Sequence, residues 1–461
     1  MNYVLISANY AAFLIAKNAA PLLPFLLHSK LPKVVYSDLP ITLAQSRPFR
    51  PINFTPLKLD FDDLPASQLD AEQKKQLQRR NQKQINEINL KFLQEMVSSE
   101  DQLREKMAFF WHGHFASRSG SPQFNELLLN KIRENALGDF KSLLLAVSTS
   151  PAMLNFLNNQ QNSKGHPNEN FARELMELFT MGRGNYTEHD VREAARACTG
   201  WSYNKDAVFI QRKNIHDEGM KTFLGKTGNF DGNAILDIIL EQPAAAKFIA
   251  TKIYRFFVNE KADDKLIHRL SEKLYATGYE IMPLLEDIFT SPWFFKKEHM
   301  GSKIKSPIEL MVGMMRILDM KVGVPENLIT YQKLLGQMLL YPPNVAGWPS
   351  GRSWIDSSTL LLRMQMPQIW TGLRPLDLKP RPDDDLEMGL PQKQNLTSTF
   401  KDPKMSIDWS KVEASFAGRN VSEIILQKSW AEGHRVFQRF SDGRVRTDII
   451  DVMSTPEYQL C

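Results

Sequence analysis

Two histidines in the stretch WHGHF, at residues 111–115, have types and spacing that could bind a metal ion. Imidazole nitrogens are common ligands of divalent metals and can also act as general bases. On a regular helix His112 and His114 point to nearly opposite sides, so they can share one metal only if Gly113 ends the helix. Two interpretations stay open: both histidines are metal ligands, or His114 is buried and hydrogen-bonded while His112 lies at the surface or supports another residue.

A second candidate is the acidic helix that the stretch NENFARELMEL, at 168–178, predicts. Glu174 and Glu177 are three residues apart on its polar face, so their carboxylates can converge on one cation or share a proton. We expect both to be catalytic candidates, with Glu174 also a metal ligand. Arg173 beside them can bind a negatively charged group of a substrate. The alternative is an ordinary solvated face of an amphipathic helix.

The third candidate, IHDEGMKT at 215–222, places four ionisable residues on a loop. His216 can serve as a metal ligand or general base, and Asp217 can act with it by orienting the imidazole. Lys221 can neutralise negative charge on a bound substrate. A hydrophilic turn without chemistry is the competing interpretation.

The fourth candidate is a rigid aromatic loop, YPPNVAGWPSGRSW at 341–354. Tryptophans among Gly, Pro and polar residues form surfaces that suit sugar rings or peptide planes. We therefore assign substrate binding to Asn344, Trp348, Arg352 and Trp354. A packed corner that closes the body of the protein is the alternative.

Composition and charge exclude several classes of function. The 461 residues carry 57 Lys and Arg against 52 Asp and Glu, so the net charge of +5 does not imply a nucleic-acid partner. The glycine-rich loops that bind nucleotide phosphates are absent. Cys198 and Cys461 lack the spacing of a zinc or dithiol site, and we expect two free thiols, although one bridge between them stays possible.

The elements that must position these residues are mostly helices. Periodicity predicts a mainly α fold, with a large multi-helix body and a small β-hairpin insertion within 201–224. Helices are expected near 67–96, 99–112, 122–136, 139–158, 168–181, 187–199, 232–258, 263–276, 280–291, 306–319, 326–340, 355–370, 409–430 and 443–453.

Changes in composition along the chain predict four regions. They are an apolar and proline-rich extended segment at 1–66, a main helical domain at 67–373, a linker at 374–405, and a C-terminal helical extension at 406–461 that packs on the main body. The basic cluster on the 67–96 helix is expected to be a solvated face.

The apolar stretch at 4–27 is interrupted by Asn9, Lys17 and two prolines, so no transmembrane anchor is expected. As written, the sequence predicts a cytoplasmic protein. A periplasmic or exported protein is expected if the N-terminus is incomplete.

Five motifs, in this order, resemble a bacterial family, the "domain of unknown function 1800" proteins. They are FWHGHFA at 110–116, NENFARELMELFTMG at 168–182, YTEHDVREAARACTGW at 186–201, HDEGMKTFLG at 216–225 and PPNVAGWPSGRSWID at 342–356. The likeness extends over roughly residues 95–461. It implies a fold but no substrate, because the family's activity is not established. Phe179 stands where many relatives have His, which removes one possible ligand.

The resemblance also implies a context. Such proteins often occur beside a sulfatase-like protein of the "domain of unknown function 1501" family, which is the partner we expect, and many are exported.

Two functions are consistent with these residues. One is a metal-dependent, hydrolase-like enzyme that acts on a polar substrate, with a divalent metal held by His112, His114, Glu174 and His216. The other is a non-catalytic binding or scaffold protein of the cell envelope, in which the motif residues form structural networks and the protein works with a partner. Whether the protein is an enzyme therefore stays open.

Overall fold

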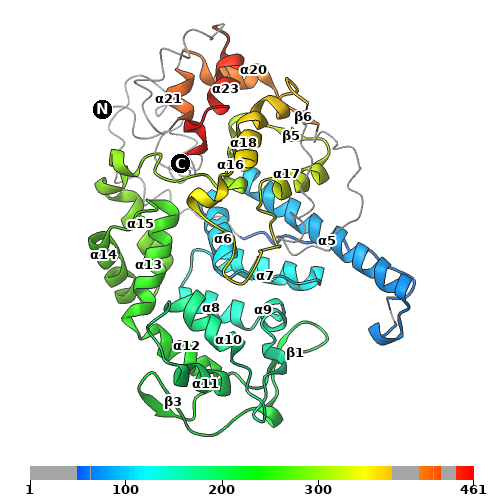
Figure 1. Ribbon diagram of the computed structural model, residues 1–461, viewed down its shortest axis with the longest axis vertical. Coiled ribbons are helices and arrows are strands. Elements are labelled where there is room, and N and C mark those ends of the chain that lie inside the picture. The colour runs from blue at the N-terminus through cyan, green and yellow to red at the C-terminus, as the bar shows by residue number, and fades with distance from the viewer. Residues whose placement is uncertain (1–48, 63, 376–403, 419, 427–442) are drawn as a thin grey trace.

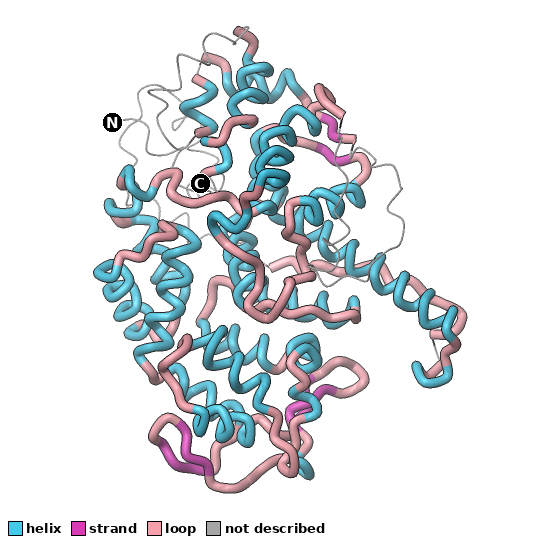
Figure 2. The backbone as a smooth tube through the Cα atoms, in the orientation of Figure 1, coloured by secondary structure: helices cyan, strands magenta, loops and turns pink. Residues whose placement is uncertain are grey.

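The described part of the protein is mainly helical, as predicted. The computed structural model describes residues 49–62, 64–375, 404–418, 420–426 and 443–461. Figures 1 and 2 show helices throughout the described chain and only small two-stranded antiparallel sheets. Within this described part, no helix is both long enough and apolar enough to span a bilayer.

The first helices form the centre of the molecule. They are α5 (Ala71–Ser98), α6 (Gln102–His114) and α7 (Pro122–Asn135). Residues 50–57 run without helix beside α5 and α7, as the prolines predict, and Ile52 exchanges backbone hydrogen bonds with the Asn130 side chain at 2.8 and 2.7 Å. The apolar stretch at 4–27 lies outside the described residues.

Helix α5 is only half embedded in the protein. A capping box, formed by Asp70 and Gln73, begins it. Its buried residues all lie at or after Gln84, where it packs against α7 and α16 (Pro307–Ile317). The first half projects from the body in Figure 1.

Prolines divide two stretches that periodicity predicts as single helices. The predicted 139–158 helix is two, α8 (Phe140–Ser148) and α9 (Pro151–Phe156), and the predicted 232–258 helix is also two, α12 (Gly232–Leu240) and α13 (Pro243–Phe257). Proline has no N–H and its ring clashes with the preceding turn, so each proline begins a new helix.

The remaining helices follow the predicted order. They are α10 (Glu169–Glu174), which continues as a π-helix over Leu175–Thr180, α11 (Glu188–Ala197), α14 (Asp264–Ala276), α15 (Ile281–Thr290), α17 (Leu328–Leu334), α18 (Ser357–Trp370), α20 (Trp409–Phe416), α21 (Val421–Ile425) and α23 (Val445–Met453).

The predicted insertion after residue 200 contains two hairpins. Strands β1 (Trp201–Tyr203) and β2 (Phe209–Gln211) pair with Trp201 opposite Gln211, and β3 (Lys221–Phe223) and β4 (Lys226–Gly228) pair with Lys221 opposite Gly228. A third pair joins β5 (Lys321–Val322) to β6 (Met405–Ser406), across the predicted linker.

The C-terminal residues return to the centre of the body. Ile304 and Leu460 form an antiparallel bridge, and Lys303 and Cys461 exchange backbone hydrogen bonds at 3.0 and 2.7 Å. Lys305 Nζ donates to the Tyr458 carbonyl at 2.6 Å. Cys198 and Cys461 are both buried and free, so no bridge joins them.

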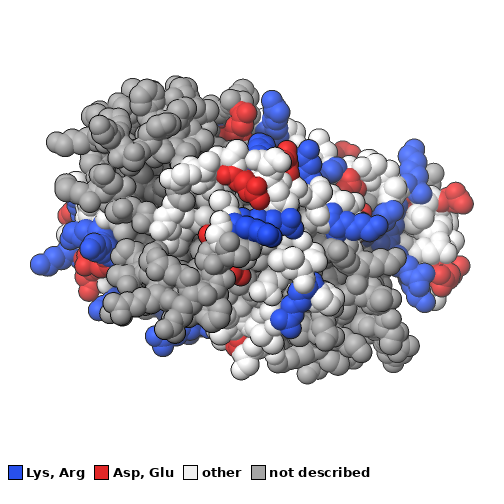
Figure 3. Space-filling view, turned by 90° about the horizontal axis from the view of Figure 1, so that it is seen from above, with Lys and Arg blue, Asp and Glu red and all other residues white. Residues whose placement is uncertain are grey.

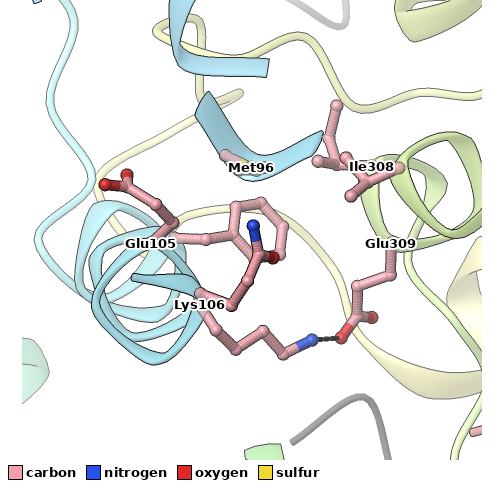
Figure 4. A pocket seen from close by; sticks show the side chains of 8 residues that line it. Met96, Glu105, Lys106, Ile308 and Glu309 are labelled. Atoms are coloured by element: carbon pink, nitrogen blue, oxygen red, sulfur yellow. Dashed lines mark hydrogen bonds and ion pairs between the residues drawn. The ribbon is translucent and has the colours of Figure 1, made fainter. Parts of the chain in front are cut away.

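A buried ion pair links α6 to α16 near this bridge. Figure 4 shows Lys106 extending from α6 toward the Glu309 carboxylate, while Glu105 on the same helix points away. Both members of the pair are at most 9% exposed, beside a cavity of about 10 Å³ that has room for about one water molecule. Burial alone would raise the pKa of Glu309, but Lys106 and Lys303 outweigh it and hold this pKa at about 2.

This ion pair predicts loss of stability in acid. The pKa of Glu309 is lower in the folded protein than its usual value of 4.5, so its contribution to stability is complete above that value and is lost as the pH falls toward 2. At neutral pH we expect Glu309→Gln to lower the free energy of unfolding by about 3 kcal/mol, because the buried ammonium group of Lys106 loses the negative charge of Glu309. The difference from wild type should shrink between pH 5 and pH 2 as measured by urea unfolding.

Exposed Glu134, which is on the surface of α7, provides the control. Glu134→Gln should leave the unfolding free energy unchanged within about 0.5 kcal/mol at every pH. A difference between wild type and Glu309→Gln that stays constant across this pH range would contradict the assignment.

Candidate functional site

His112 holds the loop that follows α17. Its Nε2 accepts a hydrogen bond from the Leu340 backbone N–H at 3.1 Å, so this nitrogen carries no proton and its lone pair is used. The ring packs against Trp348 and Phe92, with ring centroids 5.3 and 5.9 Å away. Burial lowers the pKa of His112 to about 4, which keeps the imidazole neutral near pH 7.

His114 holds a different segment, the end of the π-helix. Its Nε2 lies 3.0 Å from the Phe179 carbonyl and therefore donates to it, while Nδ1 accepts from Lys252 Nζ at 3.1 Å. Lys252, on α13, also donates to the Leu178 carbonyl at 3.2 Å. Carbonyls at the end of a helix lack partners within the helix, and these two side chains supply them.

The electrostatics of this contact favour a neutral imidazole at His114. Burial lowers the pKa of His114, and the nearby charge of Lys252 lowers it further. Burial also lowers the pKa of Lys252 to about 8. The neutral imidazole can therefore accept the hydrogen bond from the ammonium group of Lys252.

Gly113 lies inside α6, which continues to His114. The arrangement in which Gly113 ends the helix and both histidines face one metal is therefore not formed. Gly347 packs directly on Gly113: a Cβ at Gly347, whose φ is +87°, would lie 2.5 Å from the Gly113 carbonyl oxygen. This close approach requires glycine at position 347.

The carboxylates of α10 and the π-helix differ in their partners. Glu177 accepts hydrogen bonds from Arg183 Nε at 2.5 Å and Tyr186 Oη at 3.1 Å. Among the described residues, Glu174 has neither an ion-pair nor a hydrogen-bond partner for its side chain. Burial raises the pKa of Glu174, and the charge of Glu177 raises it further. Glu174 is therefore the member of the pair better suited to hold a proton.

Arg173 is held by acidic residues of its own chain. Its two terminal nitrogens each donate at 2.7 Å to the Glu188 carboxylate, and Nη2 also donates to Glu169 at 3.1 Å. The predicted substrate-binding guanidinium therefore fastens the start of α11 to α10.

The loop at 215–222 is folded by its own ionisable residues. His216 Nδ1 donates to the Thr199 carbonyl at 2.9 Å, which leaves Nε2 as the acceptor. The Asp217 carboxylate does not orient this imidazole; it accepts from Arg196 Nε at 2.8 Å and from the Gly219 N–H at 2.8 Å. The hydrogen bonds from Arg196 lower the pKa of Asp217.

Lys221 is buried beneath this loop rather than exposed to a substrate. Its Nζ donates to the carbonyls of Asp217 and Gly219 at 2.6 and 2.9 Å, and the residue is 1% exposed. Burial lowers its pKa, although Asp217 opposes this shift. Two carboxylates of α11 complete the attachment: Glu193 and Asp190 accept from the backbone N–H groups of Thr222 and Leu224, both at 2.8 Å.

The aromatic loop packs as a corner and keeps a polar outer edge. Trp354 is buried, and Trp348 is half-buried against His112. Asn344 and Arg352 are exposed, and Asn344 Oδ1 accepts from the Ala346 N–H at 2.9 Å.

The start of this loop depends on a buried amide pair. Asn89 Nδ2 donates to Gln332 Oε1 and to the Leu339 carbonyl at 2.9 and 2.8 Å. Gln332 Oε1 also accepts from the Leu339 N–H at 3.0 Å.

The described residues include no group of three His, Cys, Asp or Glu side chains that could hold a metal ion. The four predicted ligands are not brought together as such a group: His112, His114, Glu174 and His216. His112 and His114 use the lone pairs of their ring nitrogens in hydrogen bonds to protein groups. Two of these four residues keep a group that could take part in a reaction. They are Glu174, whose carboxyl group has a raised pKa, and His216, through Nε2.

Several residues that complete these networks are missing from the sequence-based candidates. Sequence patterns do not single out Lys252, because it follows an apolar stretch of α13. A lysine in such a position nevertheless indicates a buried partner. Arg196 and Glu193 form an i, i+3 pair on α11, and their spacing gives no sign that they also hold the 215–222 loop.

The contact between α6 and the aromatic loop predicts opposite effects for two glycines. Gly347→Ala should lower the free energy of unfolding by about 1–3 kcal/mol, because it adds a Cβ in the left-handed region against a backbone carbonyl. Gly113→Ala should raise it by about 0.5–1 kcal/mol, because alanine favours a helix and its Cβ meets no atom within 4 Å. Thermal and urea unfolding would measure both. Equal effects would mean that the two backbones are not in contact.

Comparison with known proteins gives one family. No curated protein and no solved structure matches the chain. The model of the family described as "Protein of unknown function (DUF1800)" matches residues 27–460, nearly the whole sequence. The chain therefore belongs to the DUF1800 family.

Proposed function

We propose that this chain is a non-catalytic binding or scaffold protein that works with a partner protein. The observation that carries the proposal is the use of the motif side chains as internal connections. His112 and His114 each bind backbone or lysine groups of other segments, and Lys221 binds two carbonyls of its own loop. Hydrogen bonds of this kind rigidify a fold and are lost if the side chain must bind a ligand.

Ion pairs account for the charged residues of the motifs in the same way. Arg173 is satisfied by Glu188 and Glu169, and Asp217 by Arg196. These pairs join α10 to α11 and α11 to the 215–222 loop. A cell-envelope location and a sulfatase-like partner of the DUF1501 family are the context that the family resemblance implies, and both belong to this proposal.

Hydrolysis at the carboxylates of α10 is a second candidate function. Glu174 and Glu177 lie where α10 changes into a π-helix, a distortion that is frequent at functional sites. The raised pKa of Glu174 suits a general acid, and a polar substrate is the class that we expect. A divalent metal at these carboxylates would need further ligands, because the described residues include no group of three His, Cys, Asp or Glu side chains that could hold one.

Metal analysis tests the proposed function. We expect purified protein to carry far less than one zinc, iron or manganese ion per chain by plasma mass spectrometry. His112→Ala should lower the free energy of unfolding by about 2 kcal/mol, because the buried Leu340 N–H loses its acceptor. Glu174→Gln should change it by less than about 0.5 kcal/mol. Stoichiometric metal that both substitutions remove would refute the scaffold assignment.

Chromogenic substrates test the second candidate separately. If the α10 carboxylates are catalytic, hydrolysis of a 4-nitrophenyl ester, phosphate or glycoside should fall by about a hundredfold or more in Glu174→Gln. Glu169→Gln on the same helix is the matched control and should retain activity, because Glu169 is paired with Arg173. The proposed scaffold function predicts no hydrolysis by wild type above the rate in buffer.

A further inference from the structure

A long groove follows one side of α5. Its volume is about 1020 Å³. One wall is α5 itself, from Lys75 to Gln94, which spans roughly 28 Å at the rise of a helix. The opposite wall comes from α16, β5 and α17 and the residues that flank them. We call this feature the α5 groove.

The floor of the α5 groove is apolar. It is formed by side chains from both walls, namely Leu90, Leu93, Met315, Val322, Leu328, Ile329 and Met338. Leu90 and Val322 are partly exposed, whereas the other five are at most 7% exposed in the free protein. A partner gains about 25 cal/mol per Å² from the apolar surface that is still in contact with water.

Basic side chains line the rim along α5. Lys75, Arg79 and Lys83 follow each other at intervals of four residues, so they stand on one face of the helix about 6 Å apart along its axis. All three are exposed, and within the described residues no carboxylate forms an ion pair with any of them. Figure 3 shows Lys and Arg side chains at the end of the molecule where α5 projects, with Asp and Glu side chains among them.

The projecting half of α5 adds an independent observation. The described side chains from Ala71 to Lys83 include no buried one, although this half completes almost four helical turns. Most of the stability of a protein helix comes from tertiary packing of one face, and this half has little of it, so its side chains are accessible to a partner.

We propose that the α5 groove binds an acidic amphipathic helix of a partner protein. Leucine-like side chains of that helix would enter the apolar floor, and its acidic residues, four apart, would repeat at the same 6 Å interval as Lys75, Arg79 and Lys83. This assignment rests on the proposed binding function and identifies its surface and the chemistry of its partner.

A synthetic peptide tests the proposal on the full-length protein. The probe is a fluorescein-labelled helix of about 18 residues, which matches the groove length, with Glu at every fourth position along one edge and Leu on the adjacent face. Fluorescence anisotropy should show binding that weakens as salt is raised. A peptide of the same composition in scrambled order should bind at least about tenfold more weakly, because the charge spacing is lost.

Two matched triple variants locate the binding surface. K75Q/R79Q/K83Q should weaken peptide binding by about tenfold or more. K164Q/K205Q/K213Q removes the same charge at exposed sites that do not line the groove, and it should change the affinity by less than about twofold. Circular dichroism should show both variants folded, since all six side chains are exposed and Gln favours the α5 helix nearly as well as Lys and Arg.

Three results would overturn the proposal. They are no binding by wild type, equal binding by K75Q/R79Q/K83Q, and self-association of wild type that this variant abolishes, which would place a second copy in the groove. If the α5 groove does not bind the peptide but the protein is metal-free and inactive, the scaffold function still stands, and the partner binds at another surface. Metal or hydrolysis that depends on the motif residues would refute the scaffold function whatever the peptide does.

Discussion

The architecture depends on one constraint at the end of α6: polar groups that are buried there must find partners inside the protein. His112, Gly113 and His114 meet this constraint by contacting three different segments. The hydrogen bonds of the two histidines span 228, 138 and 65 residues of sequence. An unsatisfied buried donor or acceptor costs about 1–3 kcal/mol, so these contacts fix how the aromatic loop, α13 and the π-helix end meet.

The same constraint explains why residues whose side chains suit catalysis make structural contacts. A histidine, an aspartate and a lysine within six residues resemble an active site, but each makes hydrogen bonds that fold its own loop. His216 and Asp217 fold the loop onto Thr199 and Arg196, and Lys221 closes it from below. Glu174 is different, because burial and the charge of Glu177 raise its pKa, although the charges of Arg173 and Arg183 oppose this shift.

Local chemistry was predictable from sequence, and long-range pairing was not. The cap of α11 by Thr187 and the hairpin turns of the insertion follow from contacts within a few residues. Pro243 indicates a break between two helices, but the apolar periodicity on both sides of it predicts one continuous helix. The partners of His112 and His114 depend on residues that lie tens to hundreds of positions away, and periodicity carries no information about those. Charge patterns likewise could not distinguish Arg173 bound to Glu188 from Arg173 open to solvent.

The bridge between Ile304 and Leu460 has a consequence for biogenesis. Lys305 reaches a carbonyl 153 residues further along the chain, and the bridge places these last residues against α16 and the Lys106–Glu309 pair. A ribosome makes the chain from its N-terminus, and its exit tunnel still encloses the newest residues. The centre of the body therefore remains incomplete until residues 458–461 have been made and have left the exit tunnel, and until then the apolar surface that they cover is open to non-native contacts.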